Sequence, residues 1–474
     1  MDAKELRDLR PELDRFLKQF DLCFSSASTR GHLPVYVLGQ LSDLDRKSAE
    51  PMAKRAEVAP RTLQEFLSLL KWDHGRMRDC LQQIVVSQHS GRNRVGLIDE
   101  TSFVKKGIMT PGVQRQWCGH LGKVENCVVT VHLGYAQGDF HCLLDGELFL
   151  PESWDADRER CHRAGIPDAV VYRPKWQIAL GMYDRALSNG VSFDWLTFDE
   201  HYGGKPEFLR ELDNRQQPYV AEVPKNIVGW LTKPQVTSRR RGRRRQPRLL
   251  AGSPRARRLD ELLKRHRQFR DQPWTPYRID DREQAPSVWE AKRVLLWTKN
   301  EDGLPGEPRH LVVARHVLRA GEVKYFLSNA PVDTPVETLL MVAFSRHRVE
   351  RCFQDQKGEV GLADFEGRTY RGLIRHLILS CVSYLFLAQA VLRRAEKKSG
   401  VDGAPGPQGD RRPDRLPVVE RLGVHTAARQ TRPGNRRHAA EQRQGAGISP
   451  EARPPVAPSQ RRPAQPNRYM ALRG

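Results

Sequence analysis

Apolar residues at the start of the chain recur every three to four positions, as Leu6, Leu9 and Leu13 show. This spacing gathers them on one face of a helix. A further helix is predicted to begin at Pro60, because proline is favoured in the first turn and apolar residues at helical spacing follow it. We therefore predict that residues 1–93 are helical.

Basic residues accompany these predicted helices at positions 54, 55, 61 and 71. A small helical domain with such cations can recognise DNA in a helix-turn-helix manner. We predict a DNA-binding role for residues 1–93, and a helical domain that serves packing alone is the alternative interpretation.

From residue 94 the pattern changes to the alternating and β-branched runs that are typical of strands. Three such runs predict an antiparallel meander, at residues 95–103, 127–135 and 140–150. Helix, strand, helix and strand patterns follow in turn, at residues 175–187, 193–199, 206–212 and 219–223. This order predicts an α/β fold of the ribonuclease H type, a mixed sheet flanked by helices. Residues 94–228 would form its first part.

Positive charge interrupts this rhythm between residues 232 and 270, where fifteen Lys and Arg face two acidic residues, a net charge of +13. Such a block is typical of a mobile, solvated loop, and here we expect an electrostatic clamp for nucleic acid. Strand patterns follow at residues 293–298, 311–315 and 323–327, which predicts a basic, β-rich insertion over residues 229–335. The arginines expected to bind DNA are Arg239, Arg240, Arg241, Arg243, Arg244 and Arg245.

A helix that carries Glu350 follows the insertion and is predicted to continue into a second apolar helix ending near Ala395. Residues 336–396 would thus complete the core. Beyond them the composition shifts to Pro, Gly, Arg and Gln, so we expect a disordered basic tail over residues 397–474. A second hypothesis is that this tail is translated out of the ancestral reading frame, which a coherent helical continuation in another frame would support.

The chain has 474 residues, 39% of them hydrophobic, and a net charge of +22. Its charge favours polyanions as partners, since attraction to phosphate grows with the number of cations that reach it. No apolar run approaches the roughly 18 residues of a membrane span, and the N-terminus lacks a signal-peptide core. We therefore expect a cytoplasmic, nucleoid-associated protein rather than one bound to a membrane surface.

The eight cysteines form no Cys-x-x-Cys pair and no regularly spaced set with histidine. Neither a zinc site nor a disulfide framework is indicated, so we expect reduced, mostly buried thiols. Three histidines are interpreted as structural residues or phosphate contacts rather than metal ligands: His120, His201 and His376.

Three acidic residues stand where a metal site could form. Asp99 lies within the first strand pattern, Asp199 follows a buried strand, where α/β folds place ligand chemistry, and Glu350 lies in a helix. Capping of a strand end or loop is the alternative role for the two aspartates. Asp194, which begins the strand that Asp199 ends, is the rival second ligand.

Carboxylate oxygens are hard ligands that suit Mg²⁺ or Mn²⁺. Two such ions about 3.5 to 4 Å apart can activate a water or a 3′-hydroxyl at a phosphodiester and stabilise the leaving oxygen. We therefore predict that Asp99, Asp199 and Glu350 bind two divalent metal ions. Phosphodiester chemistry also explains the excess of positive charge.

A short stripe of charges surrounds the third acid. On a regular helix Arg346, Glu350 and Lys357 fall within about 40° of one another. The stripe could hold a metal beside a phosphate, and an exposed ladder of ion pairs is the alternative.

Other polar positions are interpreted as structural. Gly122 and Lys123 lack the spacing of a phosphate-binding loop and predict a turn that leads into a strand. Asp139 and Asp145 lie near a predicted hairpin and are expected to serve turns.

The order of these motifs resembles that of insertion-sequence DDE transposases. The spacing of Arg346, Glu350 and Lys357 is similar to their Tyr-Arg-Glu-Lys signature, and residues 97–101 and 198–203 resemble their two aspartate blocks. Residues 122–127 and 325–331 add to a resemblance that spans about residues 30–390. The sequence departs from the signature where Ala343 takes the place of its tyrosine, which removes a hydroxyl from the expected contact with the DNA end.

The resemblance implies a role for each matched residue. Asp99, Asp199 and Glu350 would bind the metals, and Arg346 and Lys357 would hold phosphates beside the cleaved bond. Tyr325 stands where relatives place an aromatic residue that stacks on a flipped base, and a tyrosine of the core is the alternative.

Together these features predict a bacterial cut-and-paste transposase that acts on double-stranded DNA at terminal inverted repeats and in the target. The resemblance alone implies a hairpin intermediate, and pairing of two ends implies a dimer on DNA. One rival interpretation is a DNA-binding protein of transposase origin that no longer transposes. Another is a structure-specific, metal-dependent nuclease of DNA repair.

Overall fold

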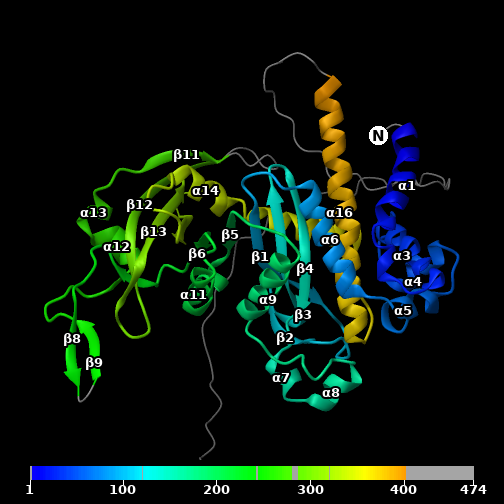
Figure 1. Ribbon diagram of the computed structural model, residues 1–474, viewed down its shortest axis with the longest axis horizontal. Helices are drawn as coiled ribbons and strands as arrows, with labels where there is room; N and C mark the ends of the chain where they lie inside the picture. The colour runs from blue at the N-terminus through cyan, green and yellow to red at the C-terminus, as the bar shows by residue number, and fades with distance from the viewer. Residues whose placement is uncertain (1–2, 120, 242–243, 280–286, 320, 402–474) are drawn as a thin grey trace, which may run out of the picture. The chain divides into compact units, whose positions relative to one another are not determined.

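The computed structural model describes residues 3–119, 121–241, 244–279, 287–319 and 321–401 (Figure 1). The tail predicted beyond residue 401 lies outside the described residues, as do His120 and Arg243.

The N-terminal segment is helical, as predicted. Local capping fixes several of its helices: the Asp73 side chain accepts a hydrogen bond from the backbone N–H of Arg76, and Pro60 occupies the first turn of its helix. Leu13 is buried, on the apolar face that the sequence predicted. The helices are α1 (Ala3–Lys18), α2 (Ala27–Arg30), α3 (His32–Gln40), α4 (Ala49–Arg55), α5 (Pro60–Ser68) and α6 (His74–Gln88), with a short 3₁₀ turn at Asp21–Cys23.

A mixed sheet forms the centre of the fold. Its first strands are β1 (Val95–Val104), β2 (Gln114–Cys118), β3 (Lys123–Gln137) and β4 (Phe140–Leu148), and β3 pairs antiparallel with the other three. Next come β5 (Trp195–Phe198) and β6 (Tyr219–Glu222); β5 runs parallel to both β1 and β6. The predicted α/β class with a mixed sheet flanked by helices is confirmed, and β2 is a strand that the sequence analysis missed.

Helices cover this sheet, and the hydrophobic core lies between the sheet and these helices. α9 (Lys175–Ser188) packs on β3 and β4, while α16 (Tyr370–Val401) packs on β4 and also contacts α3, α5 and α6. Figure 1 shows α6 and α16 side by side next to β4. Shorter helices connect the strands: α7 (Glu152–Asp155), α8 (Arg158–Arg163), α10 (Glu200–Gly203) and α11 (Pro206–Asn214).

The expectation that no apolar segment reaches the length of a membrane span is wrong for α16. Its residues Tyr370–Ala395 are long and apolar enough by composition, with a mean hydropathy of 1.5. However, 89% of that window is buried within the protein, as in the core helix of a soluble protein.

The basic region between residues 232 and 270 is not the predicted loop. Its arginine run forms a two-stranded sheet of its own, in which Arg240 pairs with Arg245, and buried Leu259, Leu262 and Phe269 give the next two helices an apolar face. The elements are β7 (Val228–Trp230), β8 (Val236–Arg241), β9 (Arg244–Leu249), β10 (Arg257–Arg258), α12 (Leu259–Arg265) and α13 (Arg267–Arg270).

Four more strands belong to the predicted β-rich insertion: β11 (Thr275–Ile279), β12 (Ser287–Lys299), β13 (Pro305–His316) and β14 (Val323–Ser328). β14 pairs antiparallel with β6, so these strands extend the central sheet instead of forming a separate one. The strand order runs β10-β7-β12-β13-β14-β6-β5-β1-β3-β2. The predicted domain boundaries remain predictions.

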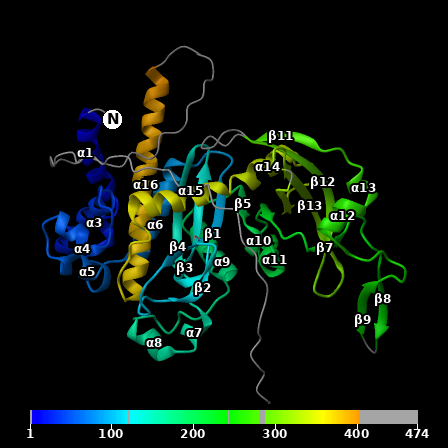
Figure 2. The same cartoon turned by 180° about the vertical axis from the view of Figure 1, so that it is seen from behind.

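The helix that carries Glu350 does not continue into the last helix, contrary to the prediction. α14 (Val336–Phe344) and α15 (His347–Asp355) precede a π-helical turn (Gln356–Val360), and Gly361 then takes a left-handed conformation with φ 73°. Glycine tolerates this conformation, which ends the helix. Seen from behind in Figure 2, α15 lies against β1 and β4, which brings Glu350 to the sheet.

Candidate active site

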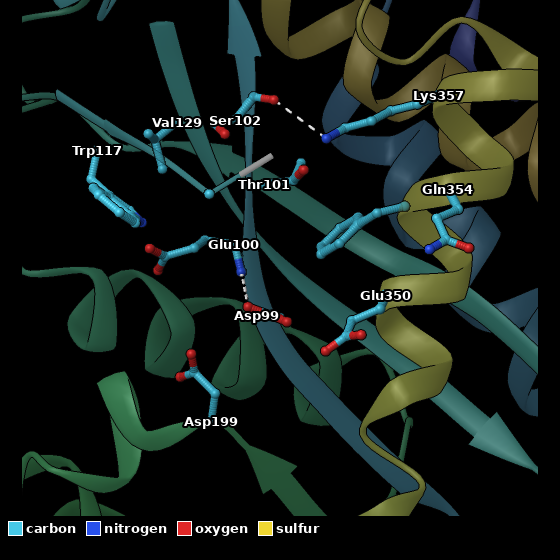
Figure 3. Close-up of a pocket in the computed structure, with 12 residues that line it drawn as sticks. Asp99, Glu100, Thr101, Ser102, Trp117, Val129, Asp199, Glu350, Gln354 and Lys357 are labelled. Carbon is cyan, nitrogen blue, oxygen red and sulfur yellow. Dashed lines mark hydrogen bonds between the residues drawn. The ribbon is translucent and has the colours of Figure 1, made fainter. Parts of the chain in front are cut away.

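A cavity of about 600 Å³ lies where β5 stops pairing with β1. β5 accompanies β1 only from Val95 to Ile98, so Asp99 is the first residue of β1 beyond this parallel pair. Ligands of α/β sheets bind at such carboxyl ends of parallel strands. We call this space the carboxylate cavity; its lining includes Asp99, Glu100, Trp117, Asp199, Glu350 and Lys357. Figure 3 shows the carboxylates of Asp99, Asp199 and Glu350 turned toward it.

Asp99 is held firmly by its strand. Its side chain is 13% exposed, and its Oδ1 accepts a hydrogen bond from the backbone N–H of Glu100 at 2.7 Å. Burial and the neighbouring Asp199 carboxylate raise the pKa of Asp99 to about 8, although the nearby Arg346 cation opposes the shift. The surroundings of the Asp99 carboxyl group therefore stabilise its charged form less well than water does.

Asp199 follows β5 and caps α10. Its Oδ1 accepts hydrogen bonds from the backbone N–H groups of His201 at 3.0 Å and Tyr202 at 3.3 Å. Burial raises the pKa of Asp199, and Arg346 again opposes the shift. Asp199 thus combines the capping role, one of the two interpretations from sequence, with a position in the cavity wall.

The rival Asp194 is engaged elsewhere. It lies immediately before β5, where its Oδ1 pairs with the Nη2 of Arg94 at 2.6 Å, and the Arg94 side chain lowers the pKa of Asp194. It does not line the carboxylate cavity.

Glu350 is the most exposed of the three acids. It lies in the first turn of α15, 51% of its side chain is exposed, and its Oε1 pairs with the Nη2 of Arg346 at 2.8 Å. An ion pair of the predicted stripe therefore forms. Lys357 lies beyond the regular helix, in the π turn, where its Nζ donates a hydrogen bond to the carbonyl oxygen of Ser102 at 3.3 Å.

Arg346 lies inside the site rather than on the surface, with 18% of its side chain exposed. Besides Glu350 it contacts two more acids: its Nη1 is 3.4 Å from Asp99 Oδ2, and its Nε is 3.6 Å from Glu222 Oε2. Glu222 was missed from the sequence. The available signal was its place at the end of a buried strand, which it shares with Asp199.

Two further residues of the cavity were also missed. Glu100 pairs with Lys175 and accepts a hydrogen bond from the hydroxyl of Tyr202 at 3.0 Å. Trp117 lines the cavity with 62% of its surface exposed, and its signal was a tryptophan within the otherwise polar strand β2.

The structure does not bring Tyr325 to the surface. It lies in β14 with 8% of its surface exposed and belongs to the hydrophobic core, as the alternative interpretation held. The predicted DNA-binding arginines other than Arg243 lie on β8 and β9, whose backbone the structure describes.

Several structural interpretations can be compared with the geometry. Gly122 occupies a turn before β3 with φ 61°, as predicted, and buried His376 bonds to Tyr36 and Leu362. The prediction for Asp145 is wrong, because this residue is buried in β4 and pairs with Arg185 at 2.7 Å. All eight cysteines are free thiols, and all but the half-buried Cys80 are buried.

The donor chemistry of Asp99, Asp199 and Glu350 fits a hard divalent cation such as Mg²⁺ or Mn²⁺. Across the described ranges, however, no three His, Cys, Asp or Glu side chains are gathered closely enough to hold a metal ion. The guanidinium of Arg346 contacts two of the three predicted ligands, Asp99 and Glu350.

Comparison with known proteins identifies the family. A family model described as "DDE superfamily endonuclease" matches residues 19–286, more than half of the chain. The protein belongs to this DDE endonuclease family. It is also 32% identical over 194 residues to the "Probable transposase for insertion sequence element IS701" of Microchaete diplosiphon. The predicted resemblance to insertion-sequence DDE transposases is thereby confirmed.

These matches cover only part of the proteins compared. The similarity to the IS701 protein covers 40% of this chain and 47% of the relative, so this DDE family member spans about half the length of the relative it matches. Among solved structures, the NurA nuclease from Sulfolobus solfataricus is 11% identical and covers 66% of this chain and 87% of its own, with a TM-score of 0.23. A TM-score this low carries no argument about the site.

Proposed function

We propose that this DDE family member is the transposase of an insertion sequence, which cleaves DNA at the element's ends and joins them to target DNA. The observation that carries the proposal is the convergence of Asp99, Asp199 and Glu350 on one cavity in a chain of this family. The proposed course is cut-and-paste transposition through a hairpin intermediate.

The three acids are the proposed ligands of two Mg²⁺ or Mn²⁺ ions. Such ions, when bound, would supply an activated water or 3′-hydroxyl and stabilise the leaving oxygen of the phosphodiester. Asp99 and Asp199 are anchored by backbone hydrogen bonds, which keeps their carboxylates oriented. Glu350 is more exposed, on the side of the cavity formed by α15.

A lysine and an aromatic ring in the cavity wall, with Arg346 beside its acids, suit a DNA strand. Lys357 is held against the Ser102 carbonyl and would bind a phosphate beside the cleaved bond, as would Arg346. The exposed ring of Trp117 offers a surface on which an unpaired base can stack. A stacking role for Tyr325 would first require its buried ring to become accessible.

Regions outside the cavity would hold the rest of the DNA. The N-terminal helices and the arginines on β8 and β9 are the proposed contacts to double-stranded DNA, both the terminal inverted repeats and the target. Because two ends must be cut and joined together, we propose that the protein works as a dimer on DNA.

Cleavage of a labelled duplex that carries the element's terminal repeats, in the presence of Mg²⁺, tests the proposal. Asp99→Asn, Asp199→Asn and Glu350→Gln should each slow cleavage by at least about 100-fold, a loss typical of removing one electrostatic contribution at a reacting centre. Asp194→Asn is the matched control, since its carboxylate pairs with Arg94 away from the cavity, and it should retain activity.

Other outcomes would reject parts of this proposal. Full activity of the three variants would exclude the assigned site, and loss of activity in Asp194→Asn but not in Asp199→Asn would reassign the second ligand. Binding of the repeats without cleavage by the wild-type protein would favour a DNA-binding protein that no longer transposes. Cleavage of branched DNA without any need for the repeats would favour a repair nuclease.

A further inference from the structure

Arg346 makes ion pairs in three directions at once. Its Nη2 lies 2.8 Å from Glu350 Oε1, its Nη1 3.4 Å from Asp99 Oδ2, and its Nε 3.6 Å from Glu222 Oε2. Two of these partners are proposed metal ligands. The third, Glu222, belongs to β6 and does not line the carboxylate cavity.

Two neighbouring acids, Glu100 and Glu222, have cations other than Arg346, whereas the charge of Arg346 also opposes the rise in the pKa of Asp199. Glu100 pairs with Lys175, and Glu222 Oε1 pairs with the Nζ of Lys324 at 2.7 Å. Asp99 and Glu350, in contrast, share the guanidinium of Arg346. Partly buried carboxylates are costly without a nearby cation, so this shared cation stabilises the site.

A guanidinium and a divalent ion compete for the same carboxylates, because the two cations repel each other at such short distances and the guanidinium already occupies one oxygen of Asp99 and one of Glu350. The Nε of Arg346 faces Glu222, while its two terminal nitrogens face Asp99 and Glu350. A small rotation of the side chain could therefore release the two proposed ligands and keep the contact with Glu222. Lys324 holds the other oxygen of Glu222 in place.

We propose that Arg346 is the built-in counter-ion of the carboxylate cavity in the DNA-free protein, and that Glu222 is the positioning residue that retains it when a divalent ion enters. This inference rests on the proposed function, which makes Asp99 and Glu350 metal ligands. The same guanidinium is the proposed phosphate contact. A DNA phosphate that draws Arg346 away from the acids therefore promotes metal binding, and by linkage metal binding promotes the phosphate contact.

Binding of Mn²⁺ to the full chain without DNA, followed by the electron paramagnetic resonance signal of the free ion, tests the counter-ion. Arg346→Met keeps much of the side-chain bulk and removes the charge, so it should bind Mn²⁺ at least about tenfold more tightly than the wild type, equal to about 1.4 kcal/mol. Arg346→Lys keeps the charge and should bind more weakly than Arg346→Met. Equal or weaker Mn²⁺ binding by Arg346→Met would overturn the proposal.

Thermal unfolding checks that each variant is folded. If Arg346→Met does not fold, Arg346→Gln takes its place, and the same tighter binding of Mn²⁺ is expected. Asp99→Asn separates this inference from the function on which it rests. If Asp99→Asn leaves Mn²⁺ binding unchanged, the proposed metal site itself fails. If Asp99→Asn abolishes binding and Arg346→Met does not strengthen it, only the counter-ion proposal fails.

A double-mutant cycle tests Glu222. If Glu222 acts by retaining Arg346, Glu222→Gln should weaken Mn²⁺ binding in the wild-type background and have a markedly smaller effect in Arg346→Met. A simple electrostatic attraction between Glu222 and the ion would persist in both backgrounds. Equal effects in the two backgrounds would therefore reject the positioning role.

Discussion

The three acids of the cavity differ in what else they do for the protein. Asp199 caps α10 through two backbone hydrogen bonds, whereas Glu350 makes its ion pair with another side chain, Arg346. Substitution of Asp199 can therefore disturb both the fold and the chemistry. The two effects can be separated by the choice of the replacing residue.

Asp199→Ala should be less stable than Asp199→Asn by about 1 kcal/mol, because asparagine can still accept the capping hydrogen bonds and alanine cannot. Both variants lose the carboxylate, so both should lose cleavage activity. Urea unfolding curves measure the stability difference. Equal stability of the two variants would show that the cap contributes little here.

The two candidate aromatic residues differ sharply in exposure, with 62% for Trp117 and 8% for Tyr325. Trp117→Ala should weaken binding of DNA with unpaired bases at its end by about tenfold, since stacking of one base contributes about 1–3 kcal/mol. Tyr325→Phe keeps the buried ring and should bind as the wild type does. Titration by fluorescence anisotropy with such a DNA compares them; a loss confined to a Tyr325→Ala variant that remains folded would favour Tyr325.

At the scale of elements, the strands covered on both faces were predictable and the polar ones were not. β1, β3, β5 and β6 carry apolar runs that sequence patterns reveal. β2 consists of Gln114–Cys118, and its polar residues give no such run. The break between α15 and α16 depends on the left-handed conformation of Gly361. A single glycine within a helical pattern does not by itself predict such a break.

The candidate site also contains residues that the sequence predicts and contacts that it does not. Asp99 and Asp199 were found because each interrupts or ends an apolar strand, a local signal. The contact between Arg346 and Glu222 joins residues 124 positions apart, the N-cap of α15 and the end of β6, so it exists only after folding. The distinction between Trp117 and Tyr325 is likewise one of burial, which aromatic character alone does not determine.

Buried polar contacts fasten α16 to the N-terminal helices. The Nη1 of Arg375 donates to backbone carbonyls of α5 and the segment after it, and the side chain of Gln40 bonds to Ser380 and Ser383. Next to them, the Nδ1 of His376 accepts from the hydroxyl of Tyr36 at 2.8 Å, and its Nε2 donates to a carbonyl oxygen at 3.1 Å. Both ring nitrogens of His376 are thus satisfied in the neutral form.

This arrangement makes the stability sensitive to acid. Burial lowers the pKa of His376 to about 4, and the nearby Lys105 cation adds to the shift. The unfolded chain, with a histidine pKa of about 6.5, binds the proton first, so stability falls as the pH drops from about 6.5 to about 4. His132 and His141 have pKa values lowered in the same direction, to about 3 and about 4.

His376→Gln isolates this residue. Between pH 7.5 and pH 5 the wild type should lose about 2 kcal/mol more free energy of unfolding than the variant, from the shift between the two pKa values. Urea unfolding at both pH values gives the two differences, with the exposed His201→Gln as the control that should follow the wild type. Parallel losses in His376→Gln and the wild type would contradict the assignment.

At the scale of the whole molecule, the net charge of +22 favours binding to DNA, and the number of phosphates that the cations neutralise determines how this binding depends on salt. Each phosphate neutralised by a cation lowers the slope of log K against log salt concentration by about 0.9. The arginines of β8 and β9 lie on a separate two-stranded sheet, so their replacement should leave the central sheet intact. The contribution of these arginines to DNA binding can therefore be measured on a folded protein.

Replacing Arg239, Arg240 and Arg241 by glutamine should reduce the magnitude of that slope by about 3, because three phosphate contacts are lost. The matched control removes the same charge from three arginines that pair with acids outside the N-terminal helices and the β8–β9 hairpin, Arg163, Arg210 and Arg319, and should change the slope by less than about 1. Binding isotherms at several salt concentrations on one duplex give both slopes. If the two triple variants lose the same amount, the attraction comes from net charge alone and the β8–β9 hairpin is no special contact to DNA.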